Sequence, residues 1–133
     1  MKDKIKALML APGEHPCITE LSTADSALIR AVNKGIHRNY KYKFMDIDTY
    51  VSVMYNHQRS FAGLQPNRKI NKDILCGTIY IVGNDTEDFL RSLDIDEFET
   101  YAKMFWDPEE YSMEEAQTAN LTYTYTEQVL KRH

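Results

Sequence analysis

Residues 75–82 constrain the fold more than any other segment, because they read Leu-Cys-Gly-Thr-Ile-Tyr-Ile-Val and carry no charged side chain. The last four are β-branched or aromatic, as is typical of a strand. A run without alternating apolar and polar residues predicts a strand that is covered on both faces. Polar turn residues follow at 83–85. We therefore expect 75–82 to be the central strand of a sheet.

Four further strands are predicted, two within residues 4–21 and two within residues 40–56. Residues 4–11 and 16–21 predict an amino-terminal hairpin, since Pro12-Gly13 between them is a turn dipeptide. Residues 40–47 and 49–56 lack Gly and Pro and predict two more strands, with a tight turn at 46–48. Residues 59–64 can extend the sheet until Gly63 and Pro66 break it. The polar residues 66–73 predict a loop or a single turn.

Two helices are predicted from apolar residues spaced three or four apart. The first covers 23–34, with Ser22 or Thr23 as its N-cap and its end near Lys34. The second covers 94–106, where Asp94 and Glu97 have the spacing of a capping box and Asp107-Pro108 ends the helix. The stripes expected to be buried are Ala24, Leu28, Ala31 and Val32 in the first helix, and Ile95, Phe98, Ala102 and Phe105 in the second.

The carboxy-terminal residues 108–133 predict an extension of the domain. Ser112 and Glu115 form a second capping box, which predicts a short helix. Residues 121–126 alternate strictly, which is strand spacing, and an exposed edge strand invites pairing. We expect this strand to contribute to a homodimer contact or to pack along the sheet edge. Nine Tyr, six Met and Trp106 also favour an oligomer, because they offer more apolar surface than a small core needs.

The order of these elements predicts a single α+β domain. Residues 1–107 form its core, a mainly antiparallel sheet with two helices packed on it, and 108–133 are an appendage. A chain of 133 residues has room for one such domain.

Charge is segregated along the chain. Residues 26–72 contain nine Lys or Arg and two Asp, whereas residues 85–115 contain twelve Asp or Glu and two basic residues. The net charge of −4 excludes a globally basic nucleic-acid binder. Two interpretations stay open at this point: the blocks are solvated faces that partly neutralise each other, or they attract an anion and a basic partner respectively.

No catalytic or metal-binding pattern is present in the sequence. The four His and two Cys lack metal-ligand spacing, and the five Gly build no phosphate-binding loop. No G-x-S-x-G elbow occurs, and no carboxylate pair can be picked out among the many acids. We expect a protein without enzymatic activity, cofactor or metal. The sequence shows no apolar run that would span a membrane and no signal peptide, so we expect it in the cytoplasm.

One group of residues predicts a binding site: Tyr55, Asn56, His57, Asn67 and Arg68. Asn and Arg carry donors of fixed geometry, and Arg can grip a phosphate or carboxylate. The expected position of Asn67 and Arg68 in a loop between strands would present them to a ligand. In the structural alternative, Asn67 caps a turn and Arg68 satisfies loop carbonyls or pairs with an acid of the 85–115 block.

These residues also carry a family resemblance. Residues 55–68 read Tyr-Asn-His-Gln-Arg-Ser-Phe-Ala-Gly-Leu-Gln-Pro-Asn-Arg, and residues 74–83 read Ile-Leu-Cys-Gly-Thr-Ile-Tyr-Ile-Val-Gly. They resemble uncharacterised domains of bacteriophages and conjugative elements, whose pattern is N-E-x-G-K-x-x-G-L-P-x-N-R, then G-D-x-x-V-G-x-x-x-V-V-G. The resemblance spans residues 5–105 and includes Ala11-Pro12-Gly13 and residues 28–36. His57 replaces an acid of that pattern, and Pro66 is shifted by one position.

The resemblance implies a genetic context but no activity. We expect a mobile-element accessory protein that acts in counter-defence in the cytoplasm of a bacterial host. In one interpretation it binds a small anionic or nucleotide ligand through Arg68, Asn67 and the aromatic rings nearby. In the other, its acidic 85–115 surface occupies a basic groove of a host protein, as an inhibitor that mimics nucleic acid.

Overall fold

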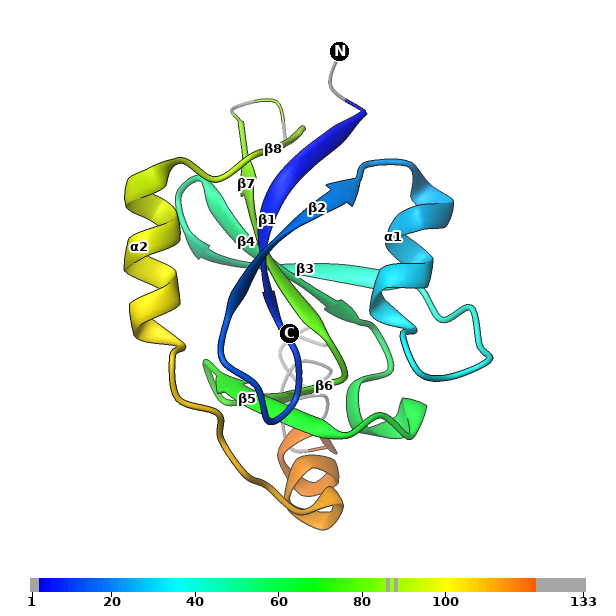
Figure 1. Cartoon of the computed structure of the whole chain (residues 1–133). Helices are drawn as coiled ribbons and strands as arrows, with labels where there is room; N and C mark the ends of the chain where they lie inside the picture. The colour runs from blue at the N-terminus through cyan, green and yellow to red at the C-terminus, as the bar shows by residue number, and fades with distance from the viewer. Residues whose placement is uncertain (1–2, 86, 88, 122–133) are drawn as a thin grey trace, which may run out of the picture.

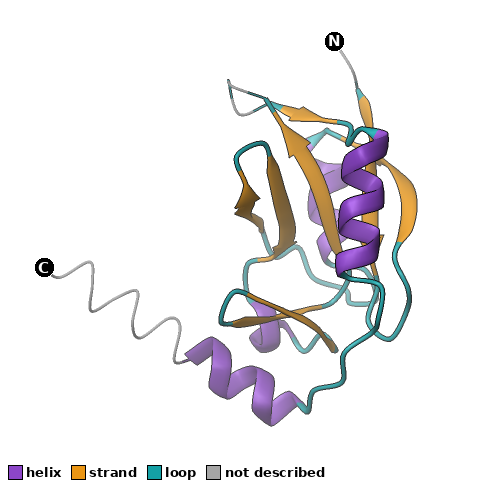
Figure 2. Ribbon diagram, turned by 90° about the vertical axis from the view of Figure 1, so that its left-hand side faces the viewer, coloured by secondary structure: helices purple, strands orange, loops and turns teal. Residues whose placement is uncertain are grey.

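The computed structural model describes residues 3–85, 87 and 89–121 and contains one antiparallel main sheet (Figures 1 and 2). Its strand order is β2-β1-β7-β4-β3, and the short β8 also pairs with β7. All of its pairings are antiparallel. The strands are β1 (Lys4–Leu10), β2 (Cys17–Ser22), β3 (Tyr42–Asp48), β4 (Val51–Asn56), β7 (Ile79–Asn84) and β8 (Leu90–Arg91). The predicted α+β domain with a mainly antiparallel sheet is confirmed.

The centre of the sheet is β7, and its two faces are covered by different helices. Ile79 and Ile81 pack in a cluster with Tyr101 of α2 (Ile95–Met104). Tyr80 and Val82 pack on the other face with side chains of α1 (Asp25–Val32). Figure 1 shows the two helices on opposite sides of the sheet. The prediction of a central strand that is covered on both faces is therefore confirmed for residues 79–82.

The same apolar run is not one strand, which corrects the prediction for 75–82. It breaks at Gly77, whose φ of +78° is the left-handed conformation that glycine adopts without strain. A side chain there would also meet Leu64, since an added Cβ would lie 2.8 Å from its Cδ1. Residues before the break belong to β6 (Asp73–Cys76), which pairs with β5 (Pro66–Ile70) in a separate two-stranded sheet. The loop predicted for 66–73 is therefore wrong, because this polar segment forms most of a hairpin.

Four smaller predictions are also corrected. The turn between β3 and β4 lies at residues 49–50 rather than 46–48. Residues 59–62 form the 3-10 helix η1 (Arg59–Ala62) instead of extending the sheet. The N-cap of α1 is Ala24 rather than Ser22 or Thr23, and alanine has no side-chain acceptor for a cap; the Thr23 hydroxyl donates to the carbonyl oxygen of Asp3 (3.3 Å). That helix ends at Val32, two residues before the predicted end.

Both predicted capping boxes are present. In α2, the Asp94 carboxylate accepts from the Glu97 N–H (2.8 Å), and the Glu97 carboxylate accepts from the Asp94 N–H (2.9 Å). In the second box, the Ser112 hydroxyl accepts from the Glu115 N–H (3.0 Å), and the Glu115 carboxylate accepts from the Ser112 N–H (3.0 Å). This box precedes a helix over residues 113–121. Capping boxes of this kind satisfy N–H groups that a helix start leaves without partners.

The helix 113–121 lies beside the β5–β6 hairpin, where Ala116 packs with Leu64, Ile74 and Cys76 (Figure 1). The strand predicted at 121–126 is not found at its first position, since Leu121 lies in this helix. Residues 122–126 lie outside the described residues. No helix in the described part of the chain is long and apolar enough to cross a membrane.

Candidate functional site

The structure places Asn67 and Arg68 on β5 with fully buried side chains. The Asn67 amide donates to the carbonyl oxygens of Leu10 (2.7 Å) and Gly77 (2.8 Å). The Arg68 guanidinium donates to the side-chain oxygen of Asn67 (2.8 Å) and to the carbonyl oxygens of Glu14 (2.7 Å) and Phe105 (3.0 Å). These contacts tie β5 to β1, to the turn after it and to the end of α2.

The environment of Arg68 matches the structural alternative for this residue. Burial lowers the pKa of its guanidinium, while the nearby Glu109 carboxylate acts in the opposite direction. Three of its N–H groups already donate to oxygen atoms of the protein. Because the side chain is also fully buried, an anion could reach Arg68 only if the surrounding chain moved. The anion-binding role predicted for Arg68 stays a prediction, and none of these contacts supports it.

The other three predicted residues follow one another at the end of β4. Asn56 is fully buried, and its amide donates to the Val32 carbonyl oxygen (3.2 Å) and the Asn33 side chain (3.0 Å). It thus closes the carboxy-terminal end of α1. Tyr55 is buried in the core. His57 is exposed, and its backbone N–H donates to the Lys41 carbonyl oxygen (2.8 Å).

The five predicted residues therefore do not form one exposed surface. The contacts of Asn56 lie at the end of α1, whereas those of Asn67 and Arg68 lie at β1 and the end of α2. Residue type and spacing favoured these positions as a binding site because Asn and Arg side chains carry several hydrogen-bond donors. In the structure, four of the five are buried, and the three with side-chain amide or guanidinium groups use these donors to satisfy oxygen atoms of the same chain.

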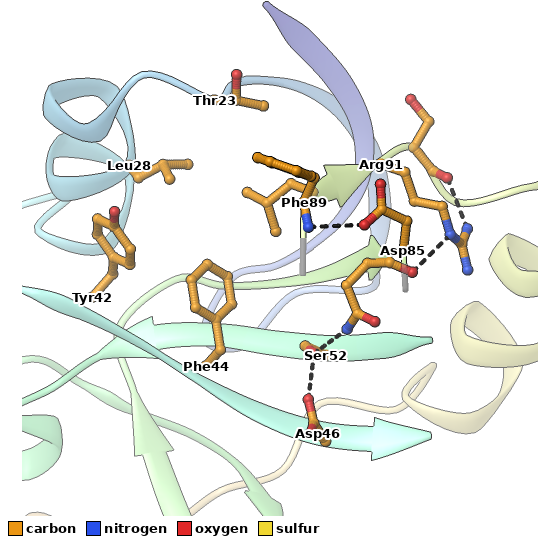
Figure 3. Close-up of a pocket in the computed structure, with 12 residues that line it drawn as sticks. Thr23, Leu28, Tyr42, Phe44, Asp46, Ser52, Asp85, Phe89 and Arg91 are labelled. Atoms are coloured by element: carbon orange, nitrogen blue, oxygen red, sulfur yellow. Dashed lines mark hydrogen bonds between the residues drawn. The ribbon is translucent and has the colours of Figure 1, made fainter. Parts of the chain in front are cut away.

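A hollow with a volume of about 990 Å³ lies on the α1 side of the sheet (Figure 3). It opens between α1, strands β3 and β4, and the turn that joins β7 to β8. In the close-up, the rings of Tyr42, Phe44 and Phe89 border the same space. We call it the β3 groove. It is lined by Thr23, Leu28, Tyr42, Phe44, Asp46, Ser52, Asn84, Asp85, Phe89, Leu90, Arg91 and Ser92.

The aromatic side of the β3 groove comes from alternate residues of β3. Tyr42 and Phe44 make an edge-to-face contact with ring centroids 5.5 Å apart, a geometry that aromatic pairs favour. The Tyr42 hydroxyl donates to the Asp25 carboxylate of α1 (2.6 Å), and this hydrogen bond raises the pKa of Tyr42. Phe89 is 63% exposed, although it is a large apolar side chain. The groove therefore presents aromatic ring faces that a ligand can reach without a change in the fold.

The polar end of the β3 groove is a chain of hydrogen bonds. The Asn84 amide donates to the Ser52 hydroxyl (2.7 Å), which donates to the Asp46 carboxylate (2.8 Å). The Asp85 carboxylate accepts from the backbone N–H groups of Glu87 (2.9 Å) and Phe89 (3.0 Å), which fixes the turn before β8. Both carboxylates are on exposed residues. In each carboxylate, the described residues donate their hydrogen bonds to one oxygen, Oδ1.

Arg91 is the basic residue of the lining, and its charge is paired. Its guanidinium donates to both carboxylate oxygens of Glu97 (2.7 and 2.9 Å) and to the carbonyl oxygens of Asn84 (3.1 Å) and Tyr50 (3.0 Å). The Arg91 partner lowers the pKa of Glu97. Gly83 leaves room for it, since an added Cβ would lie 2.6 Å from the guanidinium. The β3 groove thus has two carboxylates and one neutralised cation.

Sequence reasoning missed the β3 groove. Its only sequence signal is the alternation of Tyr42, Phe44 and Asp46 on one face of a predicted strand. The remaining lining residues come from segments between Thr23 and Ser92 that meet only in the folded chain.

The described residues include no cluster of metal-ligating side chains, and one of the two cysteines is buried. No group of three or more His, Cys, Asp or Glu among them could hold a metal ion. Burial raises the pKa of the Cys76 thiol to about 12, so it stays protonated near neutral pH.

A comparison with protein families identifies the domain. The family model described as a domain of unknown function, DUF3846, matches residues 5–106. The chain belongs to the DUF3846 family. The predicted membership of an uncharacterised domain family is thereby confirmed, with nearly the predicted bounds. No curated protein and no solved structure matches the chain. All residues that line the β3 groove fall within the DUF3846 region, whereas the helix 113–121 lies beyond it.

Proposed function

We propose that this DUF3846 protein is a non-enzymatic accessory protein of a mobile genetic element. It acts in counter-defence by holding a basic segment of a host protein in the β3 groove. The resemblance to phage and conjugative-element domains motivates the genetic context. The groove itself, with its aromatic rings and acidic end, is the observation that carries the proposal.

The chemistry of the β3 groove favours a cationic side chain as its ligand. A Lys or Arg side chain entering between Phe44 and Phe89 would place its aliphatic stem on ring faces, and its charge would interact with the π-systems. Asp46 and Asp85 lie on the same lining and would accept its hydrogen bonds. The paired Arg91 leaves an excess of negative charge that would repel an anion.

The position of β3 supports an extended partner segment. It is an outer strand of the main sheet, and β4 pairs with one of its edges. An extended peptide can add to such an edge through backbone hydrogen bonds while alternate side chains enter a neighbouring pocket. The groove begins at the side chains of Tyr42 and Phe44, so a peptide on this edge would direct every second side chain toward it.

The acidic segment 85–115 contributes to the same proposal in part. Several of its acids already serve the fold, namely Asp85, Asp94, Glu97, Glu109 and Glu115. Others are exposed and can steer a basic partner by long-range attraction, including Asp96, Glu99, Glu110 and Glu114.

Calorimetric titration with short peptides tests the proposal. The probes are twelve-residue peptides with a central Lys, a central Arg or, as an uncharged control, norleucine. We expect the Lys and Arg peptides to bind more tightly, and Asp46→Asn and Phe89→Ala each to weaken them by about fivefold to thirtyfold, which corresponds to ~1–2 kcal/mol. Binding should also weaken with added salt.

Two variants outside the groove are the matched controls. Asp96→Asn removes another exposed carboxylate, and Phe61→Ala removes another exposed phenyl ring, which is 52% exposed. Neither should change peptide affinity. Equal binding of the norleucine peptide, or equal losses in the control variants, would exclude the groove as a cation site. A thermal shift with nucleotides that depends on Arg68 would instead favour the small-ligand interpretation.

A further inference from the structure

Four basic side chains follow one another around the loop that joins α1 to β3. Arg30 lies in the last turn of α1, and the loop then carries Lys34, Arg38 and Lys41. All four residues are exposed. Figure 1 shows this loop, in cyan, on the α1 side of the sheet, whereas α2 with its acidic residues lies on the opposite side. We call these four residues the loop patch.

The loop is held in place by a buried pair of asparagines. The Asn33 amide donates to the Tyr40 carbonyl oxygen (2.7 Å), and the Asn33 side-chain oxygen accepts from the Asn56 amide (3.0 Å). Both asparagines are buried. At the end of the loop, the Lys41 carbonyl oxygen accepts from the backbone N–H of His57 (2.8 Å). The fold therefore fixes both ends of the loop and presents the loop patch at one place on the surface.

The positive charge of the loop patch is not neutralised by neighbouring acids. None of its four residues takes part in an ion pair with another described residue, and residues 26–45 contain no Asp or Glu. The flanking acids are Asp25, which accepts from the Tyr42 hydroxyl (2.6 Å), and Asp46. Asp46 lies about 16 Å beyond Lys41 along an extended chain, which exceeds the Debye length of about 8 Å at physiological ionic strength. The basic segment of the sequence thus keeps a locally positive surface, although the whole chain is acidic.

The surroundings of the loop patch favour a phosphate backbone over other polyanions. The large apolar side chains of the loop, Ile36 and Tyr40, are half-buried. A segment that binds a membrane inserts exposed apolar side chains, and a protein interface has an apolar centre. Single-stranded nucleic acid is held partly by bases that stack on exposed rings. A duplex needs none of these features, because Lys and Arg bind its closely spaced phosphates from outside.

We infer that the loop patch binds the phosphate backbone of duplex nucleic acid without reading its base sequence. Two Arg and two Lys supply the charge, and the exposed His37 and Asn39 of the same loop can donate to phosphate oxygens. Contacts to phosphates carry no base information and release counterions, so the binding is independent of sequence and strongly dependent on salt. This inference is independent of the β3 groove and of the function proposed for it.

Fluorescence anisotropy of a labelled twenty-base-pair DNA duplex tests the inference on the full-length chain. Four phosphate contacts predict a slope of about −3.6 when the logarithm of the binding constant is plotted against the logarithm of the salt concentration. The affinity should therefore fall roughly a hundredfold between 50 and 200 mM salt. A second duplex of unrelated sequence should bind equally well, and a single strand of the same length should bind more weakly.

Single neutral variants locate the binding surface. Lys34→Gln, Arg38→Gln and Lys41→Gln should each weaken duplex binding by about threefold to tenfold and make the salt slope shallower by about 0.9. Lys103→Gln is the matched control, because Lys103 is exposed on α2, on the other side of the sheet, and it should change neither quantity. All four substitutions are at exposed positions, so thermal melts should show an intact fold.

Three results would overturn the inference. The first is that the wild-type chain binds neither duplex at 50 mM salt, and the second is that the Lys103 control loses as much affinity as the loop-patch variants. The third is that unlabelled poly-glutamate competes as well as unlabelled duplex at equal charge, which would favour an acidic protein as the partner. None of these results bears on the peptide titrations of the β3 groove, because those measure a cationic ligand and different variants.

Discussion

Arg68→Ala separates the structural role of this residue from the anion-binding role predicted from sequence. The substitution removes three donors from the space between β5, the Glu14 turn and the end of α2. It leaves two backbone carbonyl oxygens and the Asn67 side-chain oxygen without that partner. A structural role predicts a large loss of stability, whereas an exposed ligand-binding residue would be replaced at little cost.

The size of the loss follows from the contacts. A hydrogen bond with a charged donor contributes roughly 1.5–3 kcal/mol. The bonds to Glu14 and Phe105 are only part-buried, so water can replace some of the lost contact. Removing the guanidinium also relieves the cost of burying a cation. We expect a net loss of about 2–4 kcal/mol, a large share of the ~5–15 kcal/mol that stabilises a typical domain. In a chain of this length, that loss lowers Tm by roughly 8–16 °C.

Thermal and urea unfolding of the full-length chain measure this loss. Lys69→Ala is the matched control, because Lys69 is the next residue of β5 and is exposed, so its truncation should stay within about ±0.5 kcal/mol. Arg68→Lys keeps the charge without the planar fork and should fall between the two. The reasoning is refuted if Arg68→Ala melts within 1 °C of wild type, that is, within ~0.3 kcal/mol. If the wild type alone is then stabilised by nucleotides, the anion-binding role is the better explanation.

Three further predictions concern single residues. Gly77→Ala and Gly13→Ala should each lower the free energy of unfolding by ~1–2 kcal/mol, because both positions have a left-handed backbone. A further loss of ~1–3 kcal/mol is expected at Gly77, where an added Cβ meets a leucine side chain at 2.8 Å, whereas Gly13 has open space. Equal urea midpoints for the two variants would contradict this. A thiol reagent at pH 8 should modify Cys17, which is exposed, and reach Cys76 only after unfolding, because burial raises its pKa to about 12; rapid labelling of both thiols in the native protein would be the contrary result. The arginine partner lowers the pKa of Glu97, so its contribution to stability is present at neutral pH and is lost as pH falls through the folded-state pKa. Glu97→Gln should therefore flatten the acid side of the Tm–pH curve, and an unchanged curve would show that the pair contributes little.

The candidate site was harder to predict than the fold, for a reason visible in Asn67 and Arg68. Their donors were correctly recognised as strong, but a sequence does not say whether the acceptor is a ligand or a carbonyl oxygen of the same chain. In the fold, Leu10, Glu14 and Phe105 bring those carbonyl oxygens from distant positions. The residues of the β3 groove form no clear binding pattern in the sequence, and they line one groove only because the fold brings β3, β8 and α1 together.

Local rules of the sequence determined several elements directly. The capping boxes at Asp94 and Ser112 formed as predicted, because both bonds of each box join residues three apart. The apolar residues 79–82 became the central strand, because burying all four side chains on the two faces of the sheet removes their apolar surface from water. The tertiary structure alone decided where the 75–82 run breaks, since Gly77 must turn away from Leu64. It also decided which polar groups were buried and which were left to form a groove, because burial depends on contacts between residues far apart in the chain.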